Sequence, residues 1–146
     1  MCVPALVPFI LGCTSSMRNA PEAPEASLHC NLQLYGQRYP LFAERQELVP
    51  DSTLDSPLDR VSGPPLRYPV ALRDAQVQGW VVMAMVIVSD GSVADAKVMA
   101  SSHPDFEPPA QVAVEGSHFT LPRRLGQPVW AFKCQTLRFL LRYGGE

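Results

Sequence analysis

A continuous apolar segment followed by an Asp-Gly pair constrains the fold of this 146-residue chain more than any other feature. Residues 80–88 are apolar at every position, Asp90-Gly91 follows, and a second β-prone segment covers residues 92–101. Asp-Gly between two such segments predicts a hairpin, because a tight turn needs residues that tolerate positive φ. A strand without polar positions should be buried on both faces, so we expect residues 80–88 to form a central strand.

After the hairpin, the sequence predicts a short helix. Four apolar residues recur at helical spacing, namely Phe106, Ala110, Ala113 and Val114. Pro108 and Pro109 fit only in the first turn, since a proline deeper in a helix costs about 3 kcal/mol, and Gly116 limits the other end. We therefore expect a helix of about two turns.

A long aromatic and β-branched segment, residues 128–141, predicts the last strand. Its apolar positions change phase along the way, and they are Trp130, Phe132, Leu137, Phe139 and Leu141. This phase change indicates a twist or a bulge near Gln135, and a similar slip in residues 92–101 indicates a bulge near Asp95. The order strand, strand, helix, strand predicts an α+β domain with a small antiparallel sheet and a helix on one face.

The ordered set of motifs resembles the C-terminal domain of the TonB family, the periplasmic end of the energy-transducing system of Gram-negative bacteria. The motifs are Leu66-Arg67-Tyr68-Pro69, the Asp90-Gly91 hairpin, Ser101-Ser102, the short helix, Phe119-Thr120-Leu121-Pro122 and Gly126-Gln127-Pro128-Val129. The resemblance implies a β-β-α-β domain over residues 65–142. It also implies a protein-binding module and not an enzyme.

In that family the last strand is a sheet edge that grips the short N-terminal box of an outer-membrane transporter. The resemblance therefore implies a peptide-binding edge here, along which the side chains on one face are Trp130, Phe132, Cys134, Thr136 and Arg138. An exposed edge carries unpaired backbone groups, which can accept an extended peptide as an extra strand. Burial in the core is the alternative role for the aromatic residues Trp130, Phe132 and Phe139.

The N-terminal residues predict a signal peptide, residues 1–13. Ile10-Leu11-Gly12-Cys13 resembles the lipobox of bacterial lipoproteins, which implies lipidation of Cys13 and a membrane anchor. No Lys or Arg follows Met1 and two prolines interrupt the apolar run, so the alternatives are a start codon placed too late or an apolar arm packed on the domain. The residues after Cys13 lack the aspartate linked with inner-membrane retention in enteric bacteria, which favours the outer membrane.

Two further segments separate this anchor from the domain. Residues 14–27 repeat a Pro-Glu-Ala unit and predict an extended tether. Residues 28–35 alternate between apolar and polar, which predicts an extra strand, and irregular structure should follow up to residue 64. We hypothesise that this extra strand covers the edge that would bind a guest.

Cys30 and Cys134 form an even pair once Cys13 is lipidated and Cys2 is removed. An exported protein permits a disulfide between them. Such a bond would close a loop of about a hundred residues and contribute about 4.7 kcal/mol in the chain-entropy model. Two buried free thiols are the alternative, and the sequence leaves both open.

No catalytic, cofactor or metal motif stands out in the sequence. Asp90 and Asp95 flank a turn, His103 follows two serines without an orienting acid, and no paired Cys or His spacing is typical of a metal site. Twelve basic against fourteen acidic residues leave no charge surplus for nucleic acid. We therefore expect a lipid-anchored periplasmic binding module for an outer-membrane transporter or another envelope protein.

Two alternatives belong to other classes of protein. One is an envelope lipoprotein that associates with itself, forming a homodimer through its sheet edges. The other is a true energy transducer whose membrane helix is encoded upstream of a misplaced start.

Overall fold

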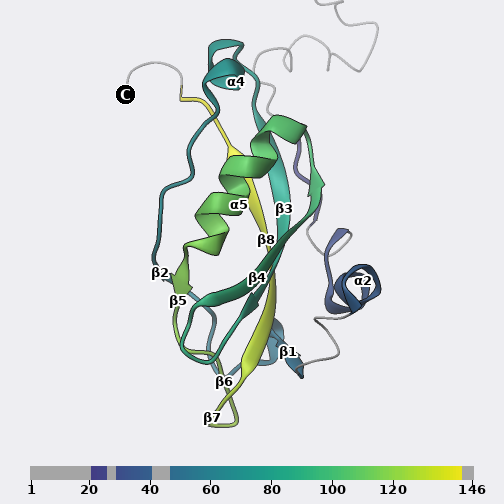
Figure 1. The fold of residues 1–146 in the computed structure, drawn as a ribbon, viewed down its shortest axis with the longest axis vertical. Helices are drawn as coiled ribbons and strands as arrows, with labels where there is room; N and C mark the ends of the chain where they lie inside the picture. Colours follow the sequence, from purple (N-terminus) through teal and green to yellow (C-terminus); the bar gives the residue numbers. More distant parts are fainter. Residues whose placement is uncertain (1–20, 26–28, 41–46, 143–146) are drawn as a thin grey trace, which may run out of the picture.

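The computed structural model describes residues 21–25, 29–40 and 47–142. Its centre is a four-stranded sheet in the order β1-β8-β3-β4 (Figure 1). The strands are β1 (Leu48–Pro50), β3 (Gly79–Ile87), β4 (Val93–Ser101) and β8 (Trp130–Phe139). β3 pairs antiparallel with both β4 and β8, whereas β1 pairs parallel with β8. The predicted α+β fold, with the strand order β-β-α-β in its second half, is confirmed.

Shorter elements surround this sheet. The helices are α2 (Leu32–Arg38), α4 (Val70–Asp74) and α5 (Glu107–Glu115), with the 3-10 turns η3 (Asp51–Thr53) and η4 (Pro104–Phe106). Two small antiparallel ribbons pair β2 (Arg60–Ser62) with β5 (His118–Phe119), and β6 (Arg123–Arg124) with β7 (Gln127–Pro128). Figure 1 shows α5 on one side of the sheet and α2 on the other.

The turn between β3 and β4 is built on Asp90-Gly91. The Asp90 carboxylate accepts hydrogen bonds from the Ser92 hydroxyl and amide, at 2.6 and 2.9 Å, and these bonds hold the pKa of Asp90 below its usual value. Gly91 has a φ of +90°, and a Cβ at this position would lie 2.2 Å from the carbonyl oxygen of Phe119. The position therefore needs glycine both for its backbone conformation and for the close approach of β5.

β3 is central and both of its faces are buried, as its unbroken apolar sequence predicts. On one face Val81, Met83, Met85 and Ile87 belong to the core beneath α5. On the other face Val82, Ala84 and Val86 belong to a second core, which includes Tyr35 of α2. Each of these β3 residues is fully buried, so the sheet separates two apolar clusters.

β8 contains no bulge near Gln135, so the bulge, one of the two predicted alternatives there, is wrong. Its register with β3 runs without a shift from Phe139, opposite Gly79, to Ala131, opposite Ile87. The even-numbered Phe132 lies in the core under α2, and the odd-numbered Phe139 lies in the core under α5. The apolar phase changes because the two helices cover opposite faces at different ends of a regular strand.

The bulge predicted near Asp95 is present. Val86 lies opposite Asp95 and Ile87 opposite Val93, so Ala94 is the extra residue of β4. The register shifts once more further along, where Met99 is the extra residue between Val98 and Ala100. Both shifts lie in the strand whose apolar residues slip in phase.

α5 has the expected length and position. Pro108 and Pro109 lie in its first turn, and the helix ends after Glu115 with Gly116 as its C-cap. All four residues of the predicted apolar stripe are buried, and they are Phe106, Ala110, Ala113 and Val114. Phe106 stacks on Phe139 of β8 at a centroid distance of 4.3 Å, which fixes the start of the helix on the sheet.

The strand predicted over residues 28–35 is not formed. Residues 32–38 form the helix α2, whose first turn is capped by the Asn31 side chain accepting from the Leu34 amide at 2.9 Å. Alternation over so few residues also fits a helix, because Leu32, Tyr35 and Tyr39 share a helical stripe that packs on the sheet. The extra strand of the sheet is instead β1, which lies further along the chain.

The predicted signal peptide and Cys13 lie outside the described residues, as does most of the predicted tether. Residues 21–25, the described part of the tether, have no helix or strand. In the described ranges, no helix combines the length and the apolar character that spanning a membrane requires.

Candidate protein-binding edge of the sheet

One side of β8 is only partly paired. β1 covers residues 130–132, with Leu48 opposite Trp130, Val49 opposite Ala131 and Pro50 opposite Phe132. Over residues 133–139, called the open edge below, no strand of the described residues pairs with the side of β8 that faces away from β3. In a β-strand, the N–H and C=O groups of every second residue point to one side, and those of the residues between them point to the other. The open edge therefore offers the hydrogen-bonding groups that an added strand would need.

Pro50 ends the pairing of β1. Proline has no backbone N–H to donate to a further ladder bond, and the chain then turns away through η3. The Thr53 hydroxyl closes this turn by donating to the Pro50 carbonyl at 2.8 Å. Asp51 pairs with Lys133 at 3.3 Å and holds η3 beside the first residue of the open edge.

A disulfide joins Cys30, just before α2, to Cys134 on β8, with the two Cα atoms 6.0 Å apart. Of the two alternatives that the sequence left open, the structure contains the disulfide. The bond attaches the N-terminal segment directly to the strand that carries the open edge.

Tyr35 attaches α2 to β4, the strand at the opposite edge of the sheet. Its ring lies 5.1 Å from that of Phe132, and its hydroxyl donates to the Asp95 carboxylate at 2.5 Å. Burial and the neighbouring carboxylate raise the pKa of the Tyr35 phenol well above its usual value. Asp95 also pairs with Lys97 at 3.0 Å, so the carboxylate beneath α2 has both a hydrogen-bond donor and a counter-charge.

A hollow of about 590 Å³ lies between α2, η3 and the start of the open edge. We call it the edge pocket, and its lining residues are Cys30, Asn31, Leu32, Gln33, Pro50, Asp51, Ser52, Phe132 and Cys134. Two of these, Phe132 and Cys134, are among the residues that the sequence placed on a peptide-binding edge. The others precede the β-β-α-β domain. For residues 30–33 the sequence indicated such a contact only through the possible Cys30–Cys134 disulfide and the hypothesis that residues 28–35 cover the edge, and it gave no sign that residues 50–52 would join them.

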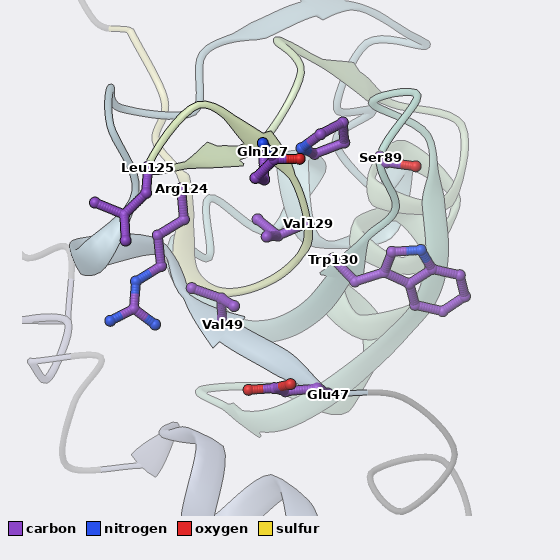
Figure 2. Close-up of a pocket in the computed structure, with 9 residues that line it drawn as sticks. Glu47, Val49, Ser89, Arg124, Leu125, Gln127, Val129 and Trp130 are labelled. Carbon is purple, nitrogen blue, oxygen red and sulfur yellow. The ribbon is translucent and has the colours of Figure 1, made fainter.

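A second hollow, of about 530 Å³, lies between β1 and the β6–β7 hairpin. Its lining residues are Glu47, Val49, Ser89, Arg124, Leu125, Gln127, Pro128, Val129 and Trp130. Figure 2 shows Val49 and Val129 near its centre, with Arg124 and Trp130 on opposite sides. Its described lining combines one acid, Glu47, and one guanidinium, Arg124, with mostly apolar neighbours.

The β6–β7 hairpin has a rigid tip. Leu125 and Gly126 both have positive φ, +52° and +77°, and the Asp55 carboxylate accepts from their amides at 2.7 and 2.8 Å. These two bonds, that from Gly126 first, hold the pKa of Asp55 below its usual value. The Leu125 side chain is 85% exposed, so this residue occupies an unfavourable conformation without packing in return.

The five residues predicted for the edge have different environments. Phe132 is 4% exposed and serves mainly as core, whereas Trp130 is half-buried against the second hollow. Cys134 is bonded to Cys30, and Thr136 is half-buried. Arg138 is exposed, and no carboxylate in the described parts of the chain pairs with it.

Comparison with known proteins identifies the family. Residues 64–140, more than half of the chain, match the family model for the Gram-negative bacterial TonB protein C-terminal. A comparison with curated proteins found no match. Among solved structures, the solution NMR structure of the Pseudomonas aeruginosa TonB CTD is 24% identical, with a TM-score of 0.46, and the match covers 62% of this chain and 93% of that chain. The resemblance inferred from the motifs is thus confirmed, and this chain belongs to the family of TonB C-terminal domains, which are protein-interaction modules of envelope transport.

Proposed function

We propose that this protein binds an extended segment of another envelope protein by adding it to the open edge as a further strand. The observation that carries the proposal is that β8 continues through residues 133–139 after β1 has ended at Pro50. Membership of the TonB C-terminal family supports a protein partner and an envelope location. An outer-membrane transporter is the partner class that fits this family best.

The sheet is suited to receive a strand because its position is fixed from both faces. β8 is held by β3 over residues 131–139, by the disulfide at Cys134 and by the stack of Phe106 on Phe139. A preorganised edge loses little conformational entropy when a guest binds. About three or four residues of the open edge each offer one N–H and one C=O, so an added strand makes about six to eight backbone hydrogen bonds at about 1 kcal/mol each. The entropy lost on association offsets most of this gain, so side-chain contacts must supply the rest.

We further propose that Cys13 is lipidated and that residues 14–27 tether the domain to a membrane, with the outer membrane favoured. The lipobox-like Ile10-Leu11-Gly12-Cys13 supports this anchor. Mass spectrometry of the native protein would show the acyl chains on Cys13. An unmodified N-terminus would remove the anchor from the proposal without affecting the open edge.

Hydrogen–deuterium exchange tests the strand addition directly. Full-length protein is mixed with synthetic peptides that correspond to the N-terminal segments of TonB-dependent transporters. We expect alternate amides within residues 133–139 to become protected, because only every second amide of β8 points to the open edge. The matched control peptide carries proline at every second position and lacks the required donors. Binding without new protection in β8, or equal binding of the proline peptide, would contradict strand addition.

The same open edge supports a second candidate function, pairing with a copy of itself. Two identical edges can pair antiparallel about a twofold axis. Sedimentation velocity over a range of concentrations distinguishes the two, since a monomer at all concentrations excludes self-pairing. If the protein dimerises, a transporter peptide that dissociates the dimer would show that both ligands use β8.

A further inference from the structure

We propose that the edge pocket is a specificity subsite for one apolar side chain of the guest, and that Arg138 selects an acidic residue four positions away. The ligand is thus an extended peptide whose apolar and acidic residues lie on the same face. This inference rests on the proposed strand addition and states which peptides the open edge prefers.

The position of the pocket follows from where β1 ends. η3 lies beside Lys133 through the Asp51–Lys133 pair, so the first guest residue with free space lies opposite Cys134. Residues directly opposite in neighbouring strands point their side chains to the same face. Cys134 faces the core under α2, and the edge pocket opens on that face. A guest residue opposite Cys134 therefore directs its side chain into the edge pocket.

The lining of the pocket favours an uncharged guest side chain. Leu32, Phe132 and the Cys30–Cys134 disulfide supply apolar walls, while Gln33 and Ser52 lie among the polar ones. The Asp51 carboxylate is also in the lining and pairs with Lys133, and none of the described lining residues is a cation that could receive an acid. A pocket of about 590 Å³ has room for leucine, isoleucine or methionine.

Arg138 provides the second determinant. It lies on the same face of β8 as Cys134, with Thr136 between them, because side chains alternate along a regular strand. Its guanidinium is exposed, and no carboxylate of the described residues neutralises it. A guest residue opposite Arg138 is four positions from the one in the edge pocket, and a carboxylate there would form a cross-strand ion pair. This spacing is the same whether the guest runs parallel or antiparallel to β8.

The subsite is a property of this chain. Most of its lining comes from residues 30–52, which precede the 64–140 segment that the family model matches. The N-terminal segment, attached through the disulfide, thus supplies the apolar wall of the pocket at the start of the open edge.

Peptide binding to the full-length protein tests the inference. The probes are short synthetic peptides with leucine and glutamate four positions apart, in both orders, and matched peptides with alanine for the leucine or lysine for the glutamate. We expect the alanine peptide to bind about tenfold more weakly, because an apolar side chain leaves the pocket. The exposed ion pair should contribute less, about threefold.

Protein variants assign these effects to residues. Leu32→Glu should weaken binding of the leucine peptide about tenfold and leave binding of the alanine peptide unchanged. The matched control is Gln37→Glu, at an exposed position of α2. Arg138→Glu should weaken the glutamate peptide and restore binding of the lysine peptide, with Arg142→Glu as its control. Thermal unfolding of each variant verifies that the fold is retained.

The outcomes separate this inference from the proposed function. Failure of every peptide to bind or to protect amides of β8 would reject strand addition itself. If the peptides protect β8 but leucine and alanine bind equally and Leu32→Glu has no effect, the edge pocket is not a subsite. If charge reversal at Arg138 is not rescued by the lysine peptide, the acidic preference is wrong.

Discussion

Pro50 of β1 lies opposite Phe132 of β8, and the parallel pairing of the two strands ends at these residues. Up to this point the outer side of β8 is occupied by a segment of the same chain. Beyond it, no strand of the described residues occupies that side. The N-terminal segment therefore restricts a guest strand to residues 133–139, and it leaves that part of the edge open.

Loss of the Cys30–Cys134 disulfide should destabilise the protein strongly. The bond closes a loop with a sequence separation of 104 residues, for which the chain-entropy model gives about 4.7 kcal/mol. Replacing both cysteines by serine should lower the free energy of unfolding in urea by about that amount. Reductant should have the same effect on the wild type and none on the double variant. An unchanged midpoint in reductant would show that the bond is absent from the native protein.

Tyr35→Phe tests how α2 is attached to the sheet. The substitution removes the hydroxyl that donates to Asp95 and should cost about 1–3 kcal/mol, because a largely buried carboxylate loses a hydrogen bond. Tyr39→Phe is the matched control, since no hydrogen bond of the Tyr39 hydroxyl is present in the described residues. Urea unfolding of both variants provides the comparison, and equal effects would contradict a specific role for the Tyr35–Asp95 bond.

Tyr35 should also make the protein less stable at alkaline pH. Burial and Asp95 raise the pKa of Tyr35 in the folded state above the usual value of about 10. Below that value the phenol is protonated in both states and its full contribution is present. As the pH rises further, the unfolded state loses its proton first, so stability falls until the folded pKa is reached. The free energy of unfolding should decline above about pH 10, and the decline should be smaller in Tyr35→Phe.

Gly91→Ala should be more harmful than Gly126→Ala, although both glycines have positive φ. A Cβ on Gly91 would lie 2.2 Å from the Phe119 carbonyl oxygen, whereas nothing lies within 4 Å of one on Gly126. We expect a cost of about 1 kcal/mol at Gly126 from backbone strain alone, and about 3 kcal/mol at Gly91, where β5 must also move. Thermal unfolding of the two variants measures the difference. Equal costs would mean that the turn between β3 and β4 adapts to the added Cβ at Gly91.

The elements that sequence predicts correctly are those determined by local chemistry. Residues 80–88 are apolar throughout, Asp90-Gly91 suits a tight turn, and Pro108-Pro109 can only begin a helix. Each of these patterns predicts its element correctly even when the residues that pack against it are unknown. These signals also identified the family, and with it the strand that carries the open edge.

The elements that sequence missed depend on tertiary contacts. The sequence predicts a strand over residues 28–35, because a short alternating segment fits either period, and only the core around Tyr35 selects the helix α2. β1 comprises Leu48–Pro50 and exists because β8 is beside it. The edge pocket was unpredictable for the same reason, since it forms only where α2 and η3 meet β8.

With α5 against one face of the sheet and α2 against the other, little of either face remains for a partner. The backbone of the sheet is then accessible mainly at the open edge, where the proposed contact is long and narrow and buries little area. Interfaces of that size are characteristic of transient complexes, whose components separate readily and meet again. The two-sided cover thus favours a protein that engages and releases its partners repeatedly over one that assembles permanently.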